Sequence, residues 1–180
     1  MDGTDEVVLS TDDLRAVAGF AAGCAETVLD FFEGVRPDDS RPREAIEAAW
    51  TFARHGRRGK ALRDTAWAAL QAAGETDDAT AEDAARAALA AASAAYLHPL
   101  HDAHQVKHIL GAAAHAARAV ELAAGGDEGV GAAHLALVRE RCPAEVADVL
   151  VRFPAAPAGG GRVGQLLRDL DAALRPALEG

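Results

Sequence analysis

Aromatic residues and cysteines are scarce in this chain of 180 residues. Only 4% of the residues are aromatic, and Cys24 and Cys142 are the two cysteines. Two distant cysteines without a CxxC pair exclude a disulfide-rich framework and a zinc knuckle. No apolar run reaches the ~18 residues that a membrane-spanning helix needs, so we expect no membrane contact.

Positive charge is also in short supply. The chain has 18 Lys and Arg against 28 Asp and Glu, a formal net charge of −10. This balance excludes general nucleic-acid binding, which needs a basic face, and it suits a basic protein partner. The first residues are acidic, unlike a secretory signal peptide, so we expect a cytoplasmic protein.

Alanine is abundant, with 46 copies, while β-branched runs are few. Because alanine is the best helix former and a poor strand former, the composition predicts an all-α fold. We expect a flexible lead over 1–10 and a single helical domain over 11–180, either a bundle or helix pairs stacked as in HEAT repeats. Since alanine buries little area, a few large side chains must carry much of the core energy, together with the leucines: Phe20, Phe31, Phe32, Trp50, Phe52, Trp67, Tyr96 and Phe153.

Apolar periodicity and chain breakers predict seven or eight helices. Their expected ranges are 12–34, 42–55, 60–73, 80–97, 99–124, 130–140, 143–152 and 162–178. Two segments resemble capping boxes, Ser10–Asp13 and Thr80–Asp83. The leucines of the last range face either the core or a second chain, which leaves a homo- or hetero-dimer open.

The histidines concentrate the side-chain chemistry. If 99–124 is one helix, four of them fall within about a 60° arc, and a fifth widens the arc to about 120°; they are His101, His104, His108 and His115, with His98 as the fifth. Three interpretations stay open: structural histidines, a polar ligand pocket, or a metal site. HxxxH alone is a weak metal signal, and Gln105 stands where a zinc protease needs Glu. We therefore predict no metal and no cofactor.

A second concentration of polar residues surrounds the start of the expected helix 42–55. Acidic Glu44 suits a helix N-terminus, while Asp39 and Arg41 form either a self-paired turn or part of a site. If Glu44 or Glu47 faces the histidines, the two groups make a general acid–base couple. The candidate catalytic residues are then His101, His104, His108 and Glu44, and the candidate ligand-binding residues are Asp39, Arg41, Glu47 and His98.

Three segments carry a family resemblance. Residues 36–49 (RPDDSRPREAIEAA), the spacing His98–x5–His104–x3–His108 followed by LGAAA, and residues 166–174 resemble the bacterial Imm-5-like immunity-protein family. By this resemblance, the family's polar positions correspond to Arg41, Pro42, Glu44, His98, His104 and His108. The chain departs from the pattern of this family at Leu70 and Gly74, where the resemblance implies His and Arg, and at His101 and Lys107.

Two functions from different classes follow. The first is a small-molecule-binding protein or tailoring enzyme of secondary metabolism, which uses a His/carboxylate pocket for cyclisation or displacement; the composition points loosely to an actinobacterial source. The alternative, which the family resemblance implies, is an immunity-type protein that binds and neutralises a basic toxin. The sequence has no dinucleotide fingerprint, P-loop or nucleophile elbow, which disfavours nucleotide-dependent chemistry and serine hydrolysis.

Overall fold

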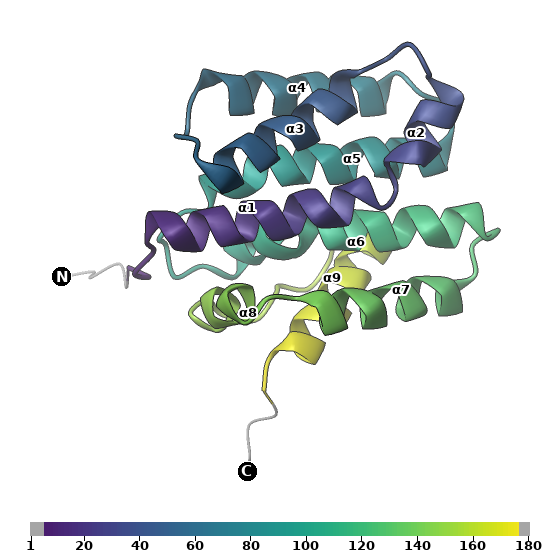
Figure 1. Cartoon of the computed structure of the whole chain (residues 1–180). Coiled ribbons are helices and arrows are strands. Elements are labelled where there is room, and N and C mark those ends of the chain that lie inside the picture. Colours follow the sequence, from purple (N-terminus) through teal and green to yellow (C-terminus); the bar gives the residue numbers. More distant parts are fainter. Residues whose placement is uncertain (1–5, 177–180) are drawn as a thin grey trace.

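A computed structural model describes residues 6–176, and over these residues the chain is all α-helical, as predicted (Figure 1). The helices of the described part are α1 (Thr11–Glu26), α2 (Leu29–Val35), α3 (Arg41–Arg54), α4 (Lys60–Gly74), α5 (Ala79–Ser93), α6 (Val106–Ala123), α7 (Glu128–Arg141), α8 (Ala144–Val151) and α9 (Gly161–Leu174), with the short 3₁₀ helices η1 (Ala94–Tyr96) and η2 (Ala103–Gln105) between α5 and α6. None of these helices is both long and apolar enough to cross a membrane.

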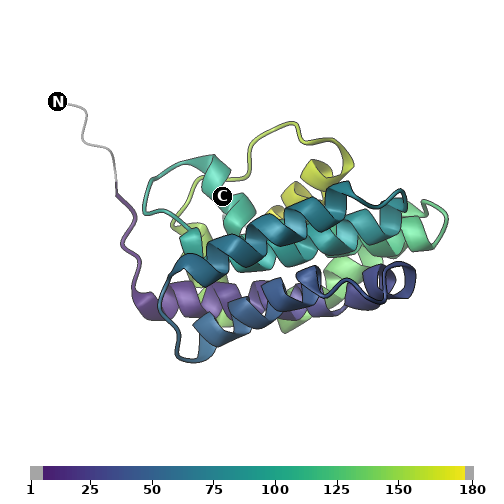
Figure 2. The same cartoon turned by 90° about the horizontal axis from the view of Figure 1, so that it is seen from above.

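Helices α5 and α6 pack side by side at the centre of the molecule (Figures 1 and 2). Their contact is built largely from alanine, because small side chains let two helix backbones approach closely. The buried alanines of α5 are Ala81, Ala84, Ala85, Ala87, Ala88, Ala91 and Ala92, and those of α6 are Ala112, Ala113, Ala114, Ala116, Ala117 and Ala119. Helices α1, α3 and α4 cover one side of this pair, and α7, α8 and α9 lie on the other side (Figure 1).

The predicted first helix over 12–34 is two helices. The predicted capping box is confirmed, because Ser10 Oγ accepts from Asp13 N–H at 3.0 Å and Asp13 accepts from Ser10 N–H at 2.9 Å. Helix α1 ends at Glu26, where the Thr27 hydroxyl donates to the Cys24 carbonyl at 2.7 Å. The break turns the chain into α2, which buries Leu29 and Phe32. The described part therefore has nine α-helices rather than seven or eight.

The buried carboxylate of Glu121 joins α9 to α6. Glu121 is fully buried, and it accepts hydrogen bonds from Arg118 Nη1 at 3.0 Å and from Arg162 Nε at 3.1 Å. Helix α7 crosses closely over it, since a Cβ at Gly131 would lie 2.2 Å from Glu121 Oε1. The small residue at this crossing leaves room for the Glu121 side chain.

Several expected boundaries and burials differ from the structure. The lead is tied to the fold, because Val7 is buried and its N–H donates to the Pro99 carbonyl at 2.8 Å. Helix α5 is capped by Asp78, whose side chain accepts from Ala81 N–H, and not by Thr80. Trp67 is 62% exposed and adds little to the core. Residues 1–5 of the predicted lead and 177–178 of the predicted last helix lie outside the described residues.

Candidate functional site

The histidines do not form one helical stripe. Helix α6 begins at Val106, so the predicted helix over 99–124 is wrong before that residue. The cause is local: the Asp102 side chain accepts the His104 N–H at 2.8 Å, and the Gln105 side chain accepts the His98 N–H at 3.0 Å. Such side-chain bonds to the backbone favour turns over a continuous helix. Residues 97–105 therefore form an irregular loop with one 3₁₀ turn.

The three histidines of this loop are at the surface. His98 and His101 are exposed, and the His104 side chain is 72% exposed, with its Nδ1 2.9 Å from Asp102 Oδ1. An imidazole in contact with water lacks the desolvated surroundings that tune a catalytic acid or base. The loop thus does not form the enclosed polar pocket that the sequence predicted.

Two histidines remain on α6, and their surroundings indicate structural roles. His115 Nδ1 lies 2.7 Å from Asp83 Oδ1, with both side chains mostly buried, which links α6 to α5. His108 is half-buried. The pKa of His108 is lowered mainly by burial and further by the charges of Lys107 and His98. Its ring is therefore neutral at neutral pH. The two rings are seven residues apart, about 10 Å along the axis, too far to share a ligand atom.

Asp39 and Arg41 form the self-paired turn. Arg41 donates from Nε to Asp39 Oδ1 at 2.8 Å, and from Nη2 to Asp39 Oδ2 at 2.7 Å and to Glu75 Oε2 at 2.6 Å. Hydrogen bonds from Arg41 hold the pKa of Asp39 below its usual value. This bidentate cluster ties the start of α3 to the end of α4, as the self-paired interpretation expects. The ligand-binding role of Asp39 and Arg41 stays a prediction.

Replacing Arg41 with methionine is expected to lower the free energy of unfolding by about 1 kcal/mol, because the lost ion pairs are only partly shielded from water. Urea unfolding measures the change, with Arg58→Met in the exposed α3–α4 loop as the matched control. An unchanged stability combined with a weakened partner complex would instead assign Arg41 to a binding surface.

The candidate carboxylates Glu44 and Glu47 lie on the exposed face of α3. Glu44 accepts a hydrogen bond from the Ser40 hydroxyl at 2.8 Å. Helices α1 and α5 pack between α3 and α6, so the structure does not bring either carboxylate to the histidines (Figure 1). The acid–base couple stays a prediction that this geometry does not support.

Glu47 instead lines an acidic hollow where three helices meet. Glu26 at the end of α1, Asp30 on α2 and Glu47 on α3 surround a space of about 300 Å³. Its other lining residues are Leu29, Ile46 and Arg43. All three carboxylates are exposed, and among the described residues none of them forms an ion pair.

Arg43 does not neutralise this acidic hollow. Its guanidinium donates to both oxygens of Glu33 at 2.7 Å. These bonds raise the pKa of Arg43 first, and the charges of Glu47 and Asp30 add to the effect. Because Glu33 already matches the charge of Arg43, the hollow keeps an excess of negative charge that a basic side chain of a partner can pair with.

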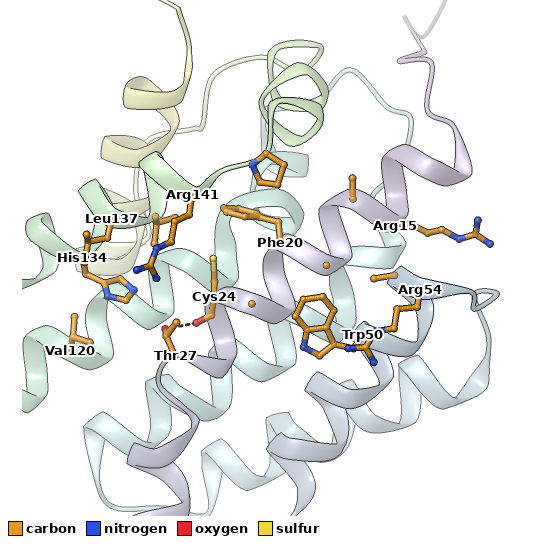
Figure 3. A pocket seen from close by; sticks show the side chains of 16 residues that line it. Arg15, Phe20, Cys24, Thr27, Trp50, Arg54, Val120, His134, Leu137 and Arg141 are labelled. Atoms are coloured by element: carbon orange, nitrogen blue, oxygen red, sulfur yellow. Dashed lines mark hydrogen bonds between the residues drawn. The ribbon is translucent and has the colours of Figure 1, made fainter.

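A groove of about 750 Å³ lies over α1 and is walled by α3 and α7 (Figure 3). Its lining residues are mostly apolar or small, with basic residues among them: Arg15, Ala16, Gly19, Phe20, Gly23, Cys24, Thr27, Trp50, Ala53, Arg54, Val120, His134, Leu137, Val138, Arg141 and Pro143. Burial, followed by the charge of Cys142, raises the pKa of Cys24 to about 12. Its thiol is therefore protonated at neutral pH and is not a nucleophile.

Sequence reasoning missed most residues of the groove and of the acidic hollow. The spacing of Gly19 and Gly23 within an expected helix was a visible signal, because interior glycines destabilise a helix and mark a close approach or an open space. His134 and Arg141 carried no comparable signal. Among residues 6–176, no three His, Cys, Asp or Glu side chains gather as metal ligands do.

The comparison with protein families gives a match over most of the chain. A family model described as "Imm-5 like putative immunity protein" covers residues 8–145. The chain belongs to this Imm-5-like family. The comparisons with curated proteins and with solved structures found no match. The matched residues run from the lead to the first turn of α8, so both the acidic hollow and the groove lie within the Imm-5-like part of the chain.

Proposed function

We propose that this Imm-5-like chain is an immunity-type protein that binds and neutralises a basic protein toxin, with the acidic hollow at the centre of the contact. Membership of the family carries the proposal, because its model covers most of the chain and its description is that of an immunity protein. The net charge of −10 adds to it, since opposite charge speeds encounter with a basic partner.

The acidic hollow suits a lysine or arginine side chain of the toxin. The carboxylates of Glu26, Asp30 and Glu47 provide charge from three helices, while Leu29 and Ile46 offer apolar contact to the methylene stem of such a side chain. Because the three acids stand on packed helices, their backbones are already in place before binding, and only the side chains need ordering. The exposed histidines of the 97–105 loop play no part in this contact.

The test measures the growth of cells that produce the protein encoded by the adjacent gene, the candidate toxin. This protein must slow growth when it is produced alone. Coexpression of the wild-type chain is expected to restore growth. The triple variant Glu26→Lys, Asp30→Lys, Glu47→Lys is expected to lose this protection, because it places three cations opposite a basic partner.

A matched control separates the acidic hollow from overall charge. The variant Asp77→Lys, Glu140→Lys, Glu145→Lys changes three exposed carboxylates outside the hollow and shifts the net charge equally. It is expected to protect as the wild type does. An adjacent gene product that is harmless, or equal protection by both triple variants, would contradict the proposal.

A further inference from the structure

The groove over α1 has a charge opposite to that of the whole chain. Although acidic residues outnumber basic ones, the residues that line the groove include Arg15, Arg54, Arg141 and His134 and no aspartate or glutamate. Figure 3 shows His134 and Arg141 at one end of the groove and Arg54 beside Trp50 toward the other end. This surface therefore cannot serve the basic partner proposed above, and it calls for an anionic occupant.

The cations of the groove are only partly satisfied from within the protein: Arg54 lies over the Trp50 ring, with its Cζ 5.3 Å from the ring centroid, and Arg15 Nη2 donates to the Gly56 carbonyl at 3.4 Å. Within residues 6–176, neither Arg54 nor Arg141 forms an ion pair with a carboxylate. Arg15 has Asp12 at 3.4 Å, but that carboxylate is 92% exposed. By contrast, Arg43 and Arg162 on other surfaces each bond a carboxylate.

Two buried nitrogen atoms of the groove residues have no hydrogen-bond partner in the described part of the chain. They are His134 Nε2 and Arg15 Nε. A buried polar atom without a partner is costly and calls for an explanation. Burial first, and then the charge of Arg141, lowers the pKa of His134, which favours the neutral ring. A neutral imidazole can donate from Nε2, and a small movement of this side chain brings the buried atom to an anionic oxygen in the groove.

The middle of the groove is apolar and open. Phe20, Trp50 and Leu137 supply its apolar side chains, and Leu137 is 49% exposed. A Cβ at Gly23 would meet no atom nearer than Trp50 Cζ2 at 3.9 Å, so packing does not require glycine there. Alanine would make α1 more stable at this position. The missing side chain instead keeps the space above α1 free.

We propose that the groove binds a small amphiphile with one anionic head group, such as an aryl or alkyl carboxylate or sulfonate. The head group lies between Arg141 and His134, and the apolar body lies against Phe20 and Trp50. The volume of about 750 Å³ falls in the range of small-molecule sites. This inference goes beyond the proposed toxin binding and uses a different surface, so either can fail alone.

The test uses two matched fluorescent probes, 8-anilinonaphthalene-1-sulfonate and its uncharged counterpart N-phenyl-1-naphthylamine. The sulfonate is expected to bind one molecule per chain. Arg141→Gln is expected to weaken it about tenfold, the effect of one charge-assisted hydrogen bond, and to leave the uncharged probe unchanged. Arg141→Lys keeps the charge and is expected to recover most of the affinity.

Control variants locate the binding. Arg139→Gln changes an exposed arginine of the same helix that does not line the groove, and it is expected to bind both probes normally. Gly23→Leu fills the groove and is expected to abolish binding of both probes, whereas Gly34→Leu, at an exposed position of α2, is expected to have no effect. Circular dichroism and thermal unfolding show that each variant is folded.

Four results would overturn the inference. They are the absence of sulfonate binding, equal affinity of Arg141→Gln and wild type for the sulfonate, binding that survives Gly23→Leu in the folded protein, and a wild-type dimer in sedimentation that Gly23→Leu dissociates. The last result would assign the groove to a second copy of this chain.

Discussion

Replacing Arg162 with methionine is expected to lower the free energy of unfolding by about 3 kcal/mol. The Glu121 carboxylate is fully buried and is held by Arg162 and Arg118. Methionine keeps the apolar stem of Arg162 but removes its charge, which leaves a buried carboxylate with one partner. Breaking a buried ion pair from one side costs about this much because the remaining charge is poorly compensated.

The pH dependence of the same variant provides a second readout. Burial by itself raises the pKa of Glu121, but hydrogen bonds from Arg162 and Arg118 outweigh it and hold the pKa below its usual value. In the wild type the carboxylate therefore stabilises the fold above its unfolded pKa of about 4.3, and this contribution is lost as the pH falls through the lower folded pKa.

In Arg162→Met the pKa of Glu121 rises, so the stability difference from wild type is largest near neutral pH and narrows on acidification. Urea unfolding at several pH values measures this difference, with Arg139→Met on the exposed face of α7 as the control. A difference of the same size at all pH values would assign the loss to packing and not to the ion pair.

Replacing Phe32 with alanine is expected to lower the free energy of unfolding by about 4 kcal/mol, the cost of a large cavity in a core. Phe32 belongs to α2 and is fully buried, and in a core made mainly of alanine few neighbouring side chains are large enough to refill the space. Trp67→Ala is the aromatic control, because Trp67 is 62% exposed and its loss is expected to change stability by less than about 0.5 kcal/mol. Chemical denaturation of the two variants measures both changes in the free energy of unfolding. Equal losses of stability in the two variants would contradict the burial pattern.

The helical fold was predictable because alanine content, apolar periodicity and the capping box at Ser10 all indicate the same local structure. The errors have local causes that periodicity does not detect. Apolar spacing runs through Val28 without a glycine or proline, yet the chain turns there because α2 buries Phe32 in the core. Likewise Pro99 suits the start of a helix, but the Asp102 side chain bonds the backbone and delays the start of α6 to Val106.

The candidate site was less predictable because it depends on tertiary contacts. Glu47 was expected to take part in a site, and it lines the acidic hollow. Glu26 and Asp30 could not be grouped with it, since they lie on two other helices that meet α3 only in the folded chain. The histidine pocket failed for the opposite reason, because its members were grouped by a helical spacing that the 97–105 loop does not have.

The most direct test of the proposed contact is titration calorimetry of the purified candidate toxin, the product of the adjacent gene, into the wild-type chain and the two triple variants. We expect tight binding to the wild type, about hundredfold weaker binding to Glu26→Lys, Asp30→Lys, Glu47→Lys, and unchanged binding to Asp77→Lys, Glu140→Lys, Glu145→Lys. Equal dissociation constants for the two triple variants would show that the acidic hollow is not the contact surface that we propose for this Imm-5-like chain.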